Sequence, residues 1–485
     1  MAGRGSRSAK DSDLADVANV VCNVQQQQAR ATHRLHRKVI APGAAVNMGD
    51  LKLYVVTFNC ARALIEPDVF GSHILQGWED PTSSNVPLPD IVVLNLQEIA
   101  PLSYAFLGNN FVKPYFDRFR QAVQVATQQQ STEGAENGFK YFNVIARHIG
   151  LTAIMVFVRD DLVDEIEIVN MAEVGVGLSE MGNKGAIGAR IGWKVSDTED
   201  LVYTTFVSAH LAPFEAEMLR RNQDYTDIAK RLVFSLEDAR EWRRAQQGAE
   251  NVPLLGGETT ERADLAAGNK GMYSNDTYLF FAGDLNYRTA LTTPGREDFE
   301  LFPQPCNDVG AALHYSHLLD KDQLSQQLHQ RKTLHGLTEQ EVNFPPTYKY
   351  HLNEDEPVLF DKDMQEWKWA KHRWPSWCDR IFYCPTYVQA GKYSSLPLFR
   401  TSDHRPVALS ASVPLKPFPS NFDLAEQAPG PLDQHYKSKR DTARRKEIVV
   451  GVAAYLATTW EGNYLLLGTI VFVLGSMWVA QSPMS

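Results

Sequence analysis

The stretch Tyr278-Leu279-Phe280-Phe281-Ala282-Gly283-Asp284-Leu285-Asn286-Tyr287-Arg288 is the most informative part of this sequence. Its first five residues form an apolar run and predict a buried strand. Gly283 allows a sharp turn where that strand ends. Asp284 and Asn286 stand two residues apart, so an extended backbone points both side chains the same way. A carboxylate that orients or deprotonates water, beside an amide that donates to a phosphoryl oxygen, suits the hydrolysis of a phosphate ester.

The same segment also has a simpler interpretation. Asp and Asn side chains often bond to the neighbouring backbone in turns. The four residues 283–286 alone therefore do not separate a catalytic loop from an ordinary turn, and the choice depends on the remainder of the chain.

The composition limits the class of protein. The 485 residues are 44% hydrophobic, which supports a sizeable core, and the formal net charge is -10. This charge disfavours a general nucleic-acid binder, because such proteins present broad basic surfaces. The five cysteines are scattered and lack CxxC spacing. They indicate reduced thiols in a cytosolic compartment, with neither a zinc site nor a disulfide framework.

The C-terminal segment Tyr464–Ala480 carries no charge over 17 residues. As a helix it would be roughly 26 Å long, which suits a thin bilayer such as that of the endoplasmic reticulum. Flanking aromatic residues and the basic cluster between Lys437 and Lys446 favour a membrane anchor that leaves the preceding domain in the cytosol. A buried C-terminal core helix is the alternative.

We expect four regions along the chain. Residues 1–47 predict a disordered N-terminal arm, and residues 48–416 a catalytic domain. We expect residues 417–447 to form a basic linker and residues 448–485 to form a single-pass membrane anchor. The first stretch of this anchor, Ile448–Thr459, is a candidate interfacial helix. Within the catalytic domain, the polar stretch Gly248–Gly271 predicts an insertion.

Apolar, strand-like segments that end in polar residues recur from residue 51 to residue 416. The expected strands are Leu53–Phe58, Ile91–Leu96, Thr152–Val158, Gly185–Trp193, Val202–Ser208, Arg380–Tyr383 and Pro406–Val413. Helical spacing is clearest in Glu215–Gln247 and Phe111–Gln128. Strands and helices that interleave with long connections predict an α/β sandwich whose active-site loops share one rim.

Polar residues at the ends of these segments form the candidate site. They are Asn59, Glu98, His210, Asp284, Asn286, Asp379, Asp403 and His404. Phosphate monoester hydrolysis is so slow without a catalyst that catalysis must supply on the order of 20 kcal/mol. A divalent cation with oxygen ligands is the usual device, and Glu98, with Asn59 beside it, is the best candidate for a Mg²⁺ ligand. We expect His404, as a neutral imidazole oriented by Asp379, to donate to a phosphoryl oxygen.

Each candidate also has a structural interpretation. Glu98 suits a helix N-terminus or the surface, and His210 suits a hydrogen-bonded place in the core. The run Asp403-His404-Arg405-Pro406 suits an ordinary loop ended by proline, and Asp379-Arg380 suits a structural ion pair. Residue type alone leaves these alternatives open.

Taken together, the sequence resembles the inositol polyphosphate 5-phosphatase family. Nine segments match in family order: Thr57–Asn59, Leu96–Ile99, Met181–Gly185, Ser208–Ala212, Arg220–Tyr225, Gly283–Arg288, Phe344–Tyr350, Pro375–Ile381 and Ser402–Val407. They cover the chain from about residue 50 to about residue 415. With its apolar C-terminal segment, the chain is similar to the fungal tail-anchored members of the endoplasmic reticulum.

The resemblance implies a four-layer α/β/β/α sandwich, two β-sheets between helices, which is shared with DNase I-like nucleases and sphingomyelinases. It also implies Mg²⁺ dependence and removal of the 5-phosphate from phosphoinositides or soluble inositol phosphates. By motif, Asp284 would activate or orient the attacking water, and Asn286 would stabilise the pentavalent phosphoryl group. The resemblance also implies that His210, and His404 held by Asp379, contact the phosphoryl oxygens. It implies a metal site made of Glu98, Asn59 and Asp403.

Basic residues of the matching segments are candidates for binding substrate phosphates: Lys184, Arg221, Lys349, Arg380 and Arg405. Lys184 and Lys349, the latter following Tyr348, are the expected contacts of a neighbouring 4-phosphate. Core packing for Tyr348 and a structural ion pair for Arg221 are the alternatives. Glu180 departs from the family, which usually carries a lysine there, and this carboxylate would weaken the local field for an anion.

The expected activity is Mg²⁺-dependent hydrolysis of phosphatidylinositol 4,5-bisphosphate at the endoplasmic reticulum membrane. A nuclease or sphingomyelinase on the same fold would use the same metal and His–Asp pair, although the net charge disfavours DNA. A non-catalytic, membrane-bound phosphoinositide-binding protein is the third possibility. The presence of Asp284, Asn286 and His404 disfavours it.

Overall fold

The computed structural model describes residues 49–83, 88–130, 140–195, 201–234, 270–352, 358–359, 366–416, 418 and 423–481. The predicted N-terminal arm and most of the predicted insertion, residues 248–269, lie outside the described residues. Those two interpretations therefore stay predictions.

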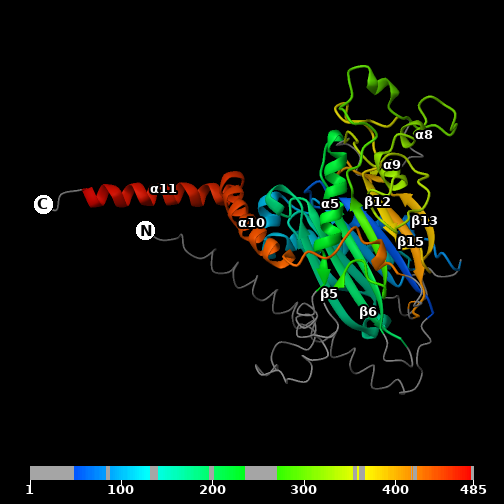
Figure 1. Ribbon diagram of the computed structural model, residues 1–485. Helices are drawn as coiled ribbons and strands as arrows, with labels where there is room; N and C mark the ends of the chain where they lie inside the picture. Colours follow the sequence, from blue (N-terminus) through cyan, green and yellow to red (C-terminus); the bar gives the residue numbers. More distant parts are fainter. Residues whose placement is uncertain are drawn as a thin grey trace, which may run out of the picture. The chain divides into compact units, whose positions relative to one another are not determined.

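The first sheet has six strands in the order β13-β15-β1-β2-β4-β3. Strands β13 and β15 of this sheet are labelled in Figure 1. Their bounds are Gln389–Ser395, Val407–Val413, Leu51–Asn59, Ile91–Gln97, Thr152–Arg159 and Tyr141–Ile149. Strand β1 runs parallel to β2, and the register pairs Asn59 with Gln97 at the ends of these two strands. Polar side chains from two separate motifs are thereby brought to one edge of the sheet.

The second sheet has five strands in the order β12-β10-β7-β6-β5. Their bounds are Asp379–Tyr383, Thr277–Asp284, Leu201–His210, Gly185–Lys194 and Ile166–Gly175. Strand β10 lies between β7, to which it is parallel, and β12, to which it is antiparallel. The apolar run that precedes Gly283 is thus a buried strand inside the sheet, as the sequence predicts.

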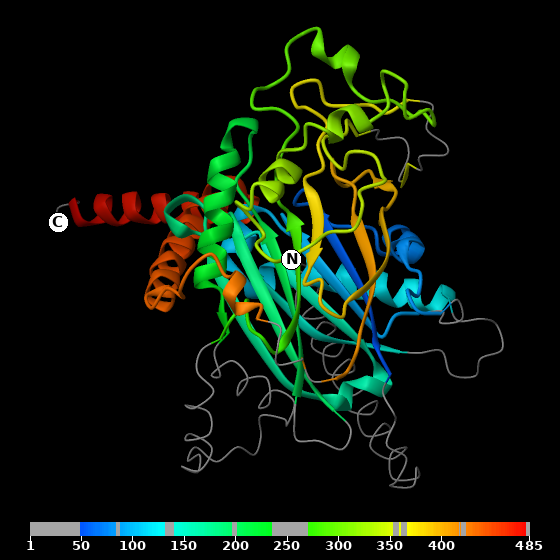
Figure 2. The ribbon, with the colours of Figure 1, turned by 45° about the vertical axis from the view of Figure 1, so that its right-hand side comes forward.

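The two sheets pack face to face, and helices cover their outer faces (Figure 2). On the six-stranded sheet lie α2 (Pro67–Ile74) and α4 (Lys113–Gln130), which contact each other through Phe70 and Phe119. On the five-stranded sheet lies α5 (Met218–Arg231), whose Tyr225 packs on Phe281 of β10. These layers form the predicted α/β/β/α sandwich.

Shorter elements complete the domain. The remaining helices are α3 (Leu102–Leu107), α8 (Ser316–Leu319) and α9 (Gln323–His329), and the remaining strands are β8 (Val233–Phe234), β9 (Lys270–Gly271), β11 (Val358–Leu359) and β14 (Leu398–Phe399). The 3-10 turns are Leu75–Gly77, Asn109–Phe111, Asp160–Glu165, Leu178–Glu180, Glu215–Glu217, Asp298–Leu301 and Ala425–Gln427.

The seven expected strands are confirmed within two residues of their predicted ends, and the expected helix Phe111–Gln128 corresponds to α4. The long helix predicted for Glu215–Gln247 is wrong in its extent. Helix α5 ends at Arg231, because the following apolar run turns into β8, which pairs with β9. β-branched and aromatic side chains favour such a strand once one of its faces is buried.

Two consecutive helices follow the sandwich, α10 (Tyr436–Thr458) and α11 (Trp460–Gln481). Residues 436–447, the second part of the predicted basic linker, lie within α10. In the part of the chain that the structure describes, no helix is both long enough and apolar enough to cross a membrane. The predicted transmembrane helix is therefore not confirmed.

Candidate active site

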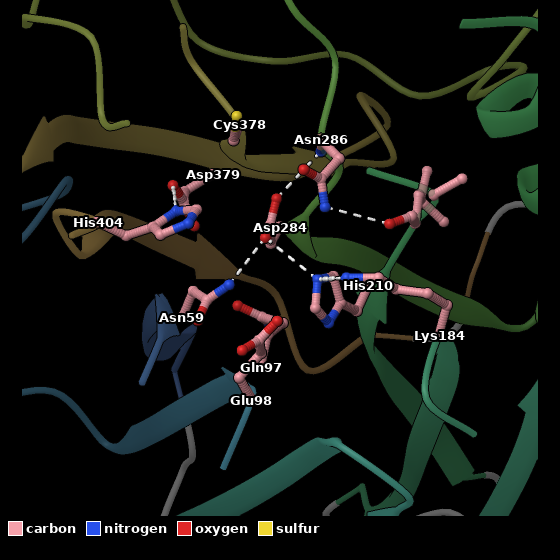
Figure 3. Close-up of polar contacts among 12 residues, drawn as sticks. Asn59, Gln97, Glu98, Lys184, His210, Asp284, Asn286, Cys378, Asp379 and His404 are labelled. Carbon is pink, nitrogen blue, oxygen red and sulfur yellow. Dashed lines mark hydrogen bonds and ion pairs between the residues drawn. The ribbon is translucent and has the colours of Figure 1, made fainter. Parts of the chain in front are cut away.

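Three neighbouring strands of the five-stranded sheet carry residues of the candidate site at their ends (Figure 3). The register places Asp284 of β10 opposite His210 of β7 and opposite Asp379 of β12. The six-stranded sheet contributes Asn59 from the end of β1 and Glu98 directly after β2. Strand ends from both sheets therefore converge on one cluster, as the motif spacing predicts.

Asp284 has the most partners in this cluster. Its Oδ2 accepts a hydrogen bond from Asn59 Nδ2 at 2.9 Å and lies 3.2 Å from His210 Nε2. Its Oδ1 accepts from the backbone N–H of Asn286 at 3.1 Å. Burial alone would raise the pKa of this carboxyl group, but the hydrogen bond with His210 and the positive charges of His404 and Lys184 hold it well below its usual value. Asp284 is therefore ionised at neutral pH.

Asn59 joins the two sheets at the site. Its side chain bonds to Asp284 of the five-stranded sheet, while its own backbone belongs to the six-stranded sheet. Its carbonyl oxygen accepts a hydrogen bond from Ser402 Oγ at 2.6 Å, and the same hydroxyl oxygen accepts from the backbone N–H of His404 at 3.1 Å. The loop that carries His404 is thus tied to both layers through one residue.

The turn after β10 depends on glycine. A Cβ at Gly283 would stand 1.9 Å from the carbonyl oxygen of Ala209 on β7, so no larger residue fits. Asn286 then has a φ of +58°, a conformation that Asn accepts more readily than most residues. Its Nδ2 donates to the Leu211 carbonyl oxygen at 3.1 Å, and Arg288 donates to its Oδ1. The amide is held beside Asp284, and its predicted contact with a phosphoryl group stays a prediction.

His404 and Asp379 form the predicted pair. His404 Nδ1 donates to Asp379 Oδ2 at 2.8 Å, and Thr347 Oγ1 donates to the same oxygen at 2.7 Å. Burial lowers the pKa of His404, but the Asp379 carboxylate raises it more strongly, to about 9. The ring is therefore protonated on both nitrogens at neutral pH, instead of being the neutral imidazole that the sequence suggests.

The residues around Asp284 can hold a divalent cation. Ligand atoms of Asp284, Asp379 and His404 lie within 4.8 Å of one another. His404 and Asp379 are already bonded to each other, so the oxygens of Glu98 and Asn59 are the more suitable donors for a hard cation. The chemistry of these donors is compatible with the predicted metal site at Glu98 and Asn59, and that site stays a prediction.

Two properties of Glu98 support this assignment. Its backbone has a φ of +48°, a strained conformation of the kind that concentrates at functional sites. Burial would raise its pKa, but His210, Lys184 and Arg62 lower it, so the side chain stays charged. Its present partner is Arg62 Nε at 2.8 Å, on the exposed side of the site. The surface alternative for Glu98 is therefore disfavoured.

Two of the predicted phosphate-binding lysines lie beside the cluster. Lys184 Nζ contacts His210 Nε2, and burial lowers the pKa of Lys184 to about 8. Lys349 Nζ is paired with the carboxylate of Asp403. Asp403 is thus paired with a lysine in the structure, and its expected contribution to the metal site with Glu98 and Asn59 stays a prediction.

Tyr348 belongs to the same wall of the site. Its ring centre lies 4.5 Å from that of His404, and the guanidinium carbon of Arg288 lies 4.3 Å from the centre of the Tyr348 ring. The tyrosine is largely buried, so it packs the histidine as well as bordering the site.

Arg221 is not placed to contact a substrate. It is fully buried, and its guanidinium donates to the carbonyl oxygens of Ala212 and Phe214 and to Gln323 Oε1, at 3.1, 2.6 and 2.6 Å. Its role is to hold the loop between β7 and α5, which corrects the expectation of phosphate binding. The alternative of an ion pair is also wrong, because its partners are neutral oxygens.

Arg380 and Arg405 are structural as well. Arg380 forms ion pairs with Asp322 at 2.9 Å and with Glu339 at 2.5 Å, inside the domain. The guanidinium carbon of Arg405 lies 4.7 Å from the centre of the Tyr350 ring, and the residue is fully buried. Both were expected to bind phosphate because basic residues of a matching motif look alike in sequence, although both side chains are buried inside the domain.

Three residues of the site were not predicted. Arg288 holds the Asn286 amide, Thr347 bonds to Asp379, and Gln97 lies beside Glu98 (Figure 3). Each stands in one of the nine matching segments, within two residues of a predicted site residue. Their polarity within these motifs was the available signal.

Glu180 does not act as an unpaired negative charge. Its Oε1 accepts from Arg231 of α5 at 2.9 Å. The cation from α5 offsets the carboxylate, so the expected weakening of the field for an anion is smaller than the sequence implies.

Comparisons with known proteins agree with this site. The model of Endonuclease/Exonuclease/phosphatase family 2 matches residues 56–410. The chain is 29% identical to the Type II inositol 1,4,5-trisphosphate 5-phosphatase of Mus musculus, over 66% of this chain and 26% of that protein. It is 28% identical to the Inositol-1,4,5-trisphosphate 5-phosphatase 1 of Schizosaccharomyces pombe, over 74% and 27%. The matches span about a quarter of the length of these relatives.

A solved structure shares the fold. It is the inositol polyphosphate 5-phosphatase domain of SPsynaptojanin in complex with inositol (1,4)-bisphosphate and calcium ion. The TM-score is 0.53 at 23% identity, over 82% of this chain and 93% of that domain. The matched family range includes the site residues from Asn59 to His404. The chain therefore belongs to endonuclease/exonuclease/phosphatase family 2 and, within it, to the inositol polyphosphate 5-phosphatase family.

Proposed function

We propose that this chain removes the 5-phosphate of phosphatidylinositol 4,5-bisphosphate in a Mg²⁺-dependent hydrolysis. The observation that carries the proposal is the meeting of Asp284, His210 and the Asp379–His404 pair at three adjacent strand ends. Relatives are named as 5-phosphatases of inositol 1,4,5-trisphosphate and of phosphatidylinositol 3,4,5-trisphosphate, which supports the inositol phosphate class.

The side chains divide the reaction between them. Asp284 orients the attacking water and accepts its proton, since Asn59 and the Asn286 N–H hold the carboxylate in one orientation. The water oxygen forms a bond to phosphorus in line with the breaking bond to the inositol oxygen. His404, held at Nδ1 by Asp379, donates from Nε2 to a phosphoryl oxygen and offsets its charge.

Glu98 and Asn59 would hold the cation. When bound there, Mg²⁺ would supply positive charge to polarise the phosphate ester. His210 lies 3.2 Å from Asp284 Oδ2 and binds another phosphoryl oxygen.

Two lysines support an inositol phosphate over a nucleic acid. Lys184 and Lys349 flank the cluster, one beside His210 and the other beside Tyr348, so they are suited to a second phosphate on a compact ring. A net charge of -10 disfavours a long polyanion such as DNA. A nuclease or sphingomyelinase remains the alternative, because the hydrolytic groups would be the same.

The lipid form of the substrate is favoured by the C-terminal helix. Along α11 the apolar side chains Leu465, Val471 and Phe472 are exposed, which favours insertion into an apolar medium. We place the protein at the endoplasmic reticulum membrane with the sandwich in the cytosol. Membrane fractionation of the full chain and of a chain lacking residues 464–485 tests this, and retention of the shortened chain on membranes would contradict it.

The activity is tested by measuring phosphate release from the full chain with Mg²⁺. The substrates are phosphatidylinositol 4,5-bisphosphate, phosphatidylinositol 3,4,5-trisphosphate, soluble inositol 1,4,5-trisphosphate and DNA. We expect the bisphosphate lipid to be hydrolysed fastest and DNA to be left intact. Cleavage of DNA without release of inositol phosphate would favour the nuclease.

A further inference from the structure

Helix α10 follows the segment that the family model matches, residues 56–410, yet it is docked on the sandwich. Its buried residues Ala443, Glu447 and Gly451 are spaced four apart and form one face. A Cβ at Gly451 would stand 2.9 Å from Cβ of Phe106 in α3, and Arg444 donates to the Phe106 carbonyl oxygen at 2.6 Å. This close approach fixes α10 against α3.

Glu447 is the charged centre of that face. It is completely buried, and its two oxygens accept from the two terminal nitrogens of Arg440 at 2.6 and 3.0 Å. Arg444 approaches at 3.3 Å. Burial of a carboxylate is unfavourable unless such partners compensate it. Both arginines belong to α10 itself, so they neutralise Glu447 without connecting it to the site.

A further partner of Glu447 does make that connection. The backbone N–H of Gly182 donates to Glu447 Oε1 at 2.8 Å, across a buried contact between distant parts of the chain. The Gly182 carbonyl oxygen accepts from the Leu151 N–H at 2.9 Å. A Cβ at Gly150 would stand 2.1 Å from that same oxygen, so the turn packs tightly here. Both polar backbone groups of Gly182 are therefore fixed, one of them by α10.

Gly182 stands two residues before Lys184, whose Nζ reaches His210 in the active site. We propose that Glu447 is a positioning residue for Lys184, and that α10 is thereby a working part of the active site. Because Glu447 fixes the Gly182 amide, it determines where the turn before β6 places the side chain of Lys184. The kinetic consequence rests on the proposed function, whereas the fixing of the turn does not.

A purely structural role gives a different expectation. If Glu447 served only to dock α10, its removal would loosen the helix and leave the turn before β6 unchanged. Any loss of activity would then be independent of Lys184. Asp441 is an exposed carboxylate on the same helix, so Asp441→Ala is the matched control.

The first experiment measures hydrogen exchange of the Gly182 amide in the full chain. In Glu447→Ala we expect this amide to exchange at least about tenfold faster, because its acceptor is gone. Glu447→Gln keeps an acceptor and should give a smaller increase, which also serves if the alanine variant folds poorly. Asp441→Ala should match the wild type. Unchanged exchange at Gly182 in both Glu447 variants overturns the proposal, whatever the activity.

The second experiment is a double-mutant cycle with Lys184→Ala, measured on soluble inositol trisphosphate so that membrane attachment has no effect. We expect Glu447→Ala alone to raise KM about tenfold or more, with a smaller change in kcat. In the Lys184→Ala background the same substitution should have little further effect, because coupled residues are not additive. Glu447→Gln should recover most of the wild-type KM.

The outcomes separate the two proposals. Additive losses in the cycle, or a loss seen with lipid substrate alone, would overturn the positioning role. A wild-type chain that releases no phosphate from any inositol substrate would overturn the proposed function instead. The exchange measurement would still decide whether Glu447 fixes the turn.

Discussion

Asp284 is surrounded by donors and by positive groups, and these set its chemistry. Asn59 and the Asn286 N–H orient its two oxygens, while His210 and His404 keep it ionised. A carboxylate held in this way can position water without reorganisation during the reaction.

Asp284→Asn tests that role. The amide keeps the size of the side chain but cannot accept the proton of water, so we expect kcat to fall about 100- to 10,000-fold. Asp320→Asn, at an exposed aspartate, should leave kcat unchanged. Circular dichroism checks that both variants fold. Turnover within about threefold of wild type in Asp284→Asn would remove Asp284 from the reaction.

The Asp379–His404 pair predicts a pH dependence. Asp379 raises the pKa of His404 to about 9, so the donating imidazolium is present below that pH and is lost as pH rises through it. In Asp379→Asn the pKa should fall toward its ordinary value of about 6.5. The alkaline limb of kcat/KM should therefore move to lower pH by at least about one unit. An unmoved limb would mean that His404 does not act as an imidazolium.

At the residue scale, the sequence indicated which polar groups gather at the candidate site but not which groups support them. Asp284, His210, Asp379 and His404 were found because each stands at the edge of an apolar run. Arg221 was misread, because a motif shows that a cation is present and not which way its side chain leaves the backbone. Burial against neutral oxygens is a property of the packed structure alone.

At the scale of single elements, β10 and its two neighbours act as the frame of the site. Each strand places one residue of the candidate site at the same level of the sheet, so the spacing between strands sets the spacing of these side chains. At the close contact between Gly283 and Ala209, the two strands leave no room for a larger side chain.

Gly283→Ala should disturb the close packing of β10 against β7. The added methyl group would overlap the Ala209 carbonyl oxygen, so we expect a loss of about 3 kcal/mol in the free energy of unfolding, together with most of the activity. Urea denaturation measures the first effect. Gly49→Ala, where a Cβ would meet no atom within 4 Å, is the control. Equal stability of the two variants would contradict the predicted clash.

Substitution of a buried structural arginine and of a lysine expected to bind substrate should have different effects on stability and on KM. Arg380→Met leaves buried Asp322 and Glu339 without their partner and should lower the free energy of unfolding by about 3–5 kcal/mol. Lys349→Met breaks a partly exposed pair and should cost less than about 1 kcal/mol, while raising KM about tenfold. Denaturation and steady-state kinetics on both variants check this. A raised KM in an otherwise stable Arg380→Met would restore that arginine as a substrate ligand.

Element type and order were largely predictable, because seven strands show clear apolar runs. Edge strands such as β3 and β13 were missed, since their exposed faces carry polar residues and dilute the pattern. The end of α5 was missed because helical spacing continues in sequence where the structure changes to a strand. Local pattern cannot indicate that β9, far along the chain, supplies a partner.

At the scale of the whole molecule, the active site is the place where the two sheets meet. Glu98 and Asn59 come from one sheet, and Asp284 comes from the other. A cation bound among them would link both layers and stabilise the folded state.

Mg²⁺ should therefore raise the melting temperature. At about 100 times its dissociation constant, a ligand that binds only the folded chain contributes about 2.7 kcal/mol. We expect a rise of a few degrees, reversed by a chelator, together with loss of activity. Glu98→Gln should abolish the rise, and Glu300→Gln, at an exposed glutamate, should not. An equal rise in both variants would place the cation elsewhere.

The layered fold was expected from the family resemblance, and the structure has it. The docking of α10 was not expected, because its basic residues resemble a solvated linker when read alone. Glu447 is recognisable as a buried residue only after its helix meets α3 and the turn at Gly182.

Asn59 gives the arrangement of layers a functional meaning. Its side chain touches the reacting carboxylate, and its carbonyl oxygen holds the loop of His404 through Ser402. Any sliding of one sheet over the other would move the nucleophile-activating group relative to the phosphoryl-binding group. The rate of turnover should therefore depend on how firmly the two sheets pack against each other. A change that loosens this packing should lower the rate before it reduces the cooperativity of unfolding.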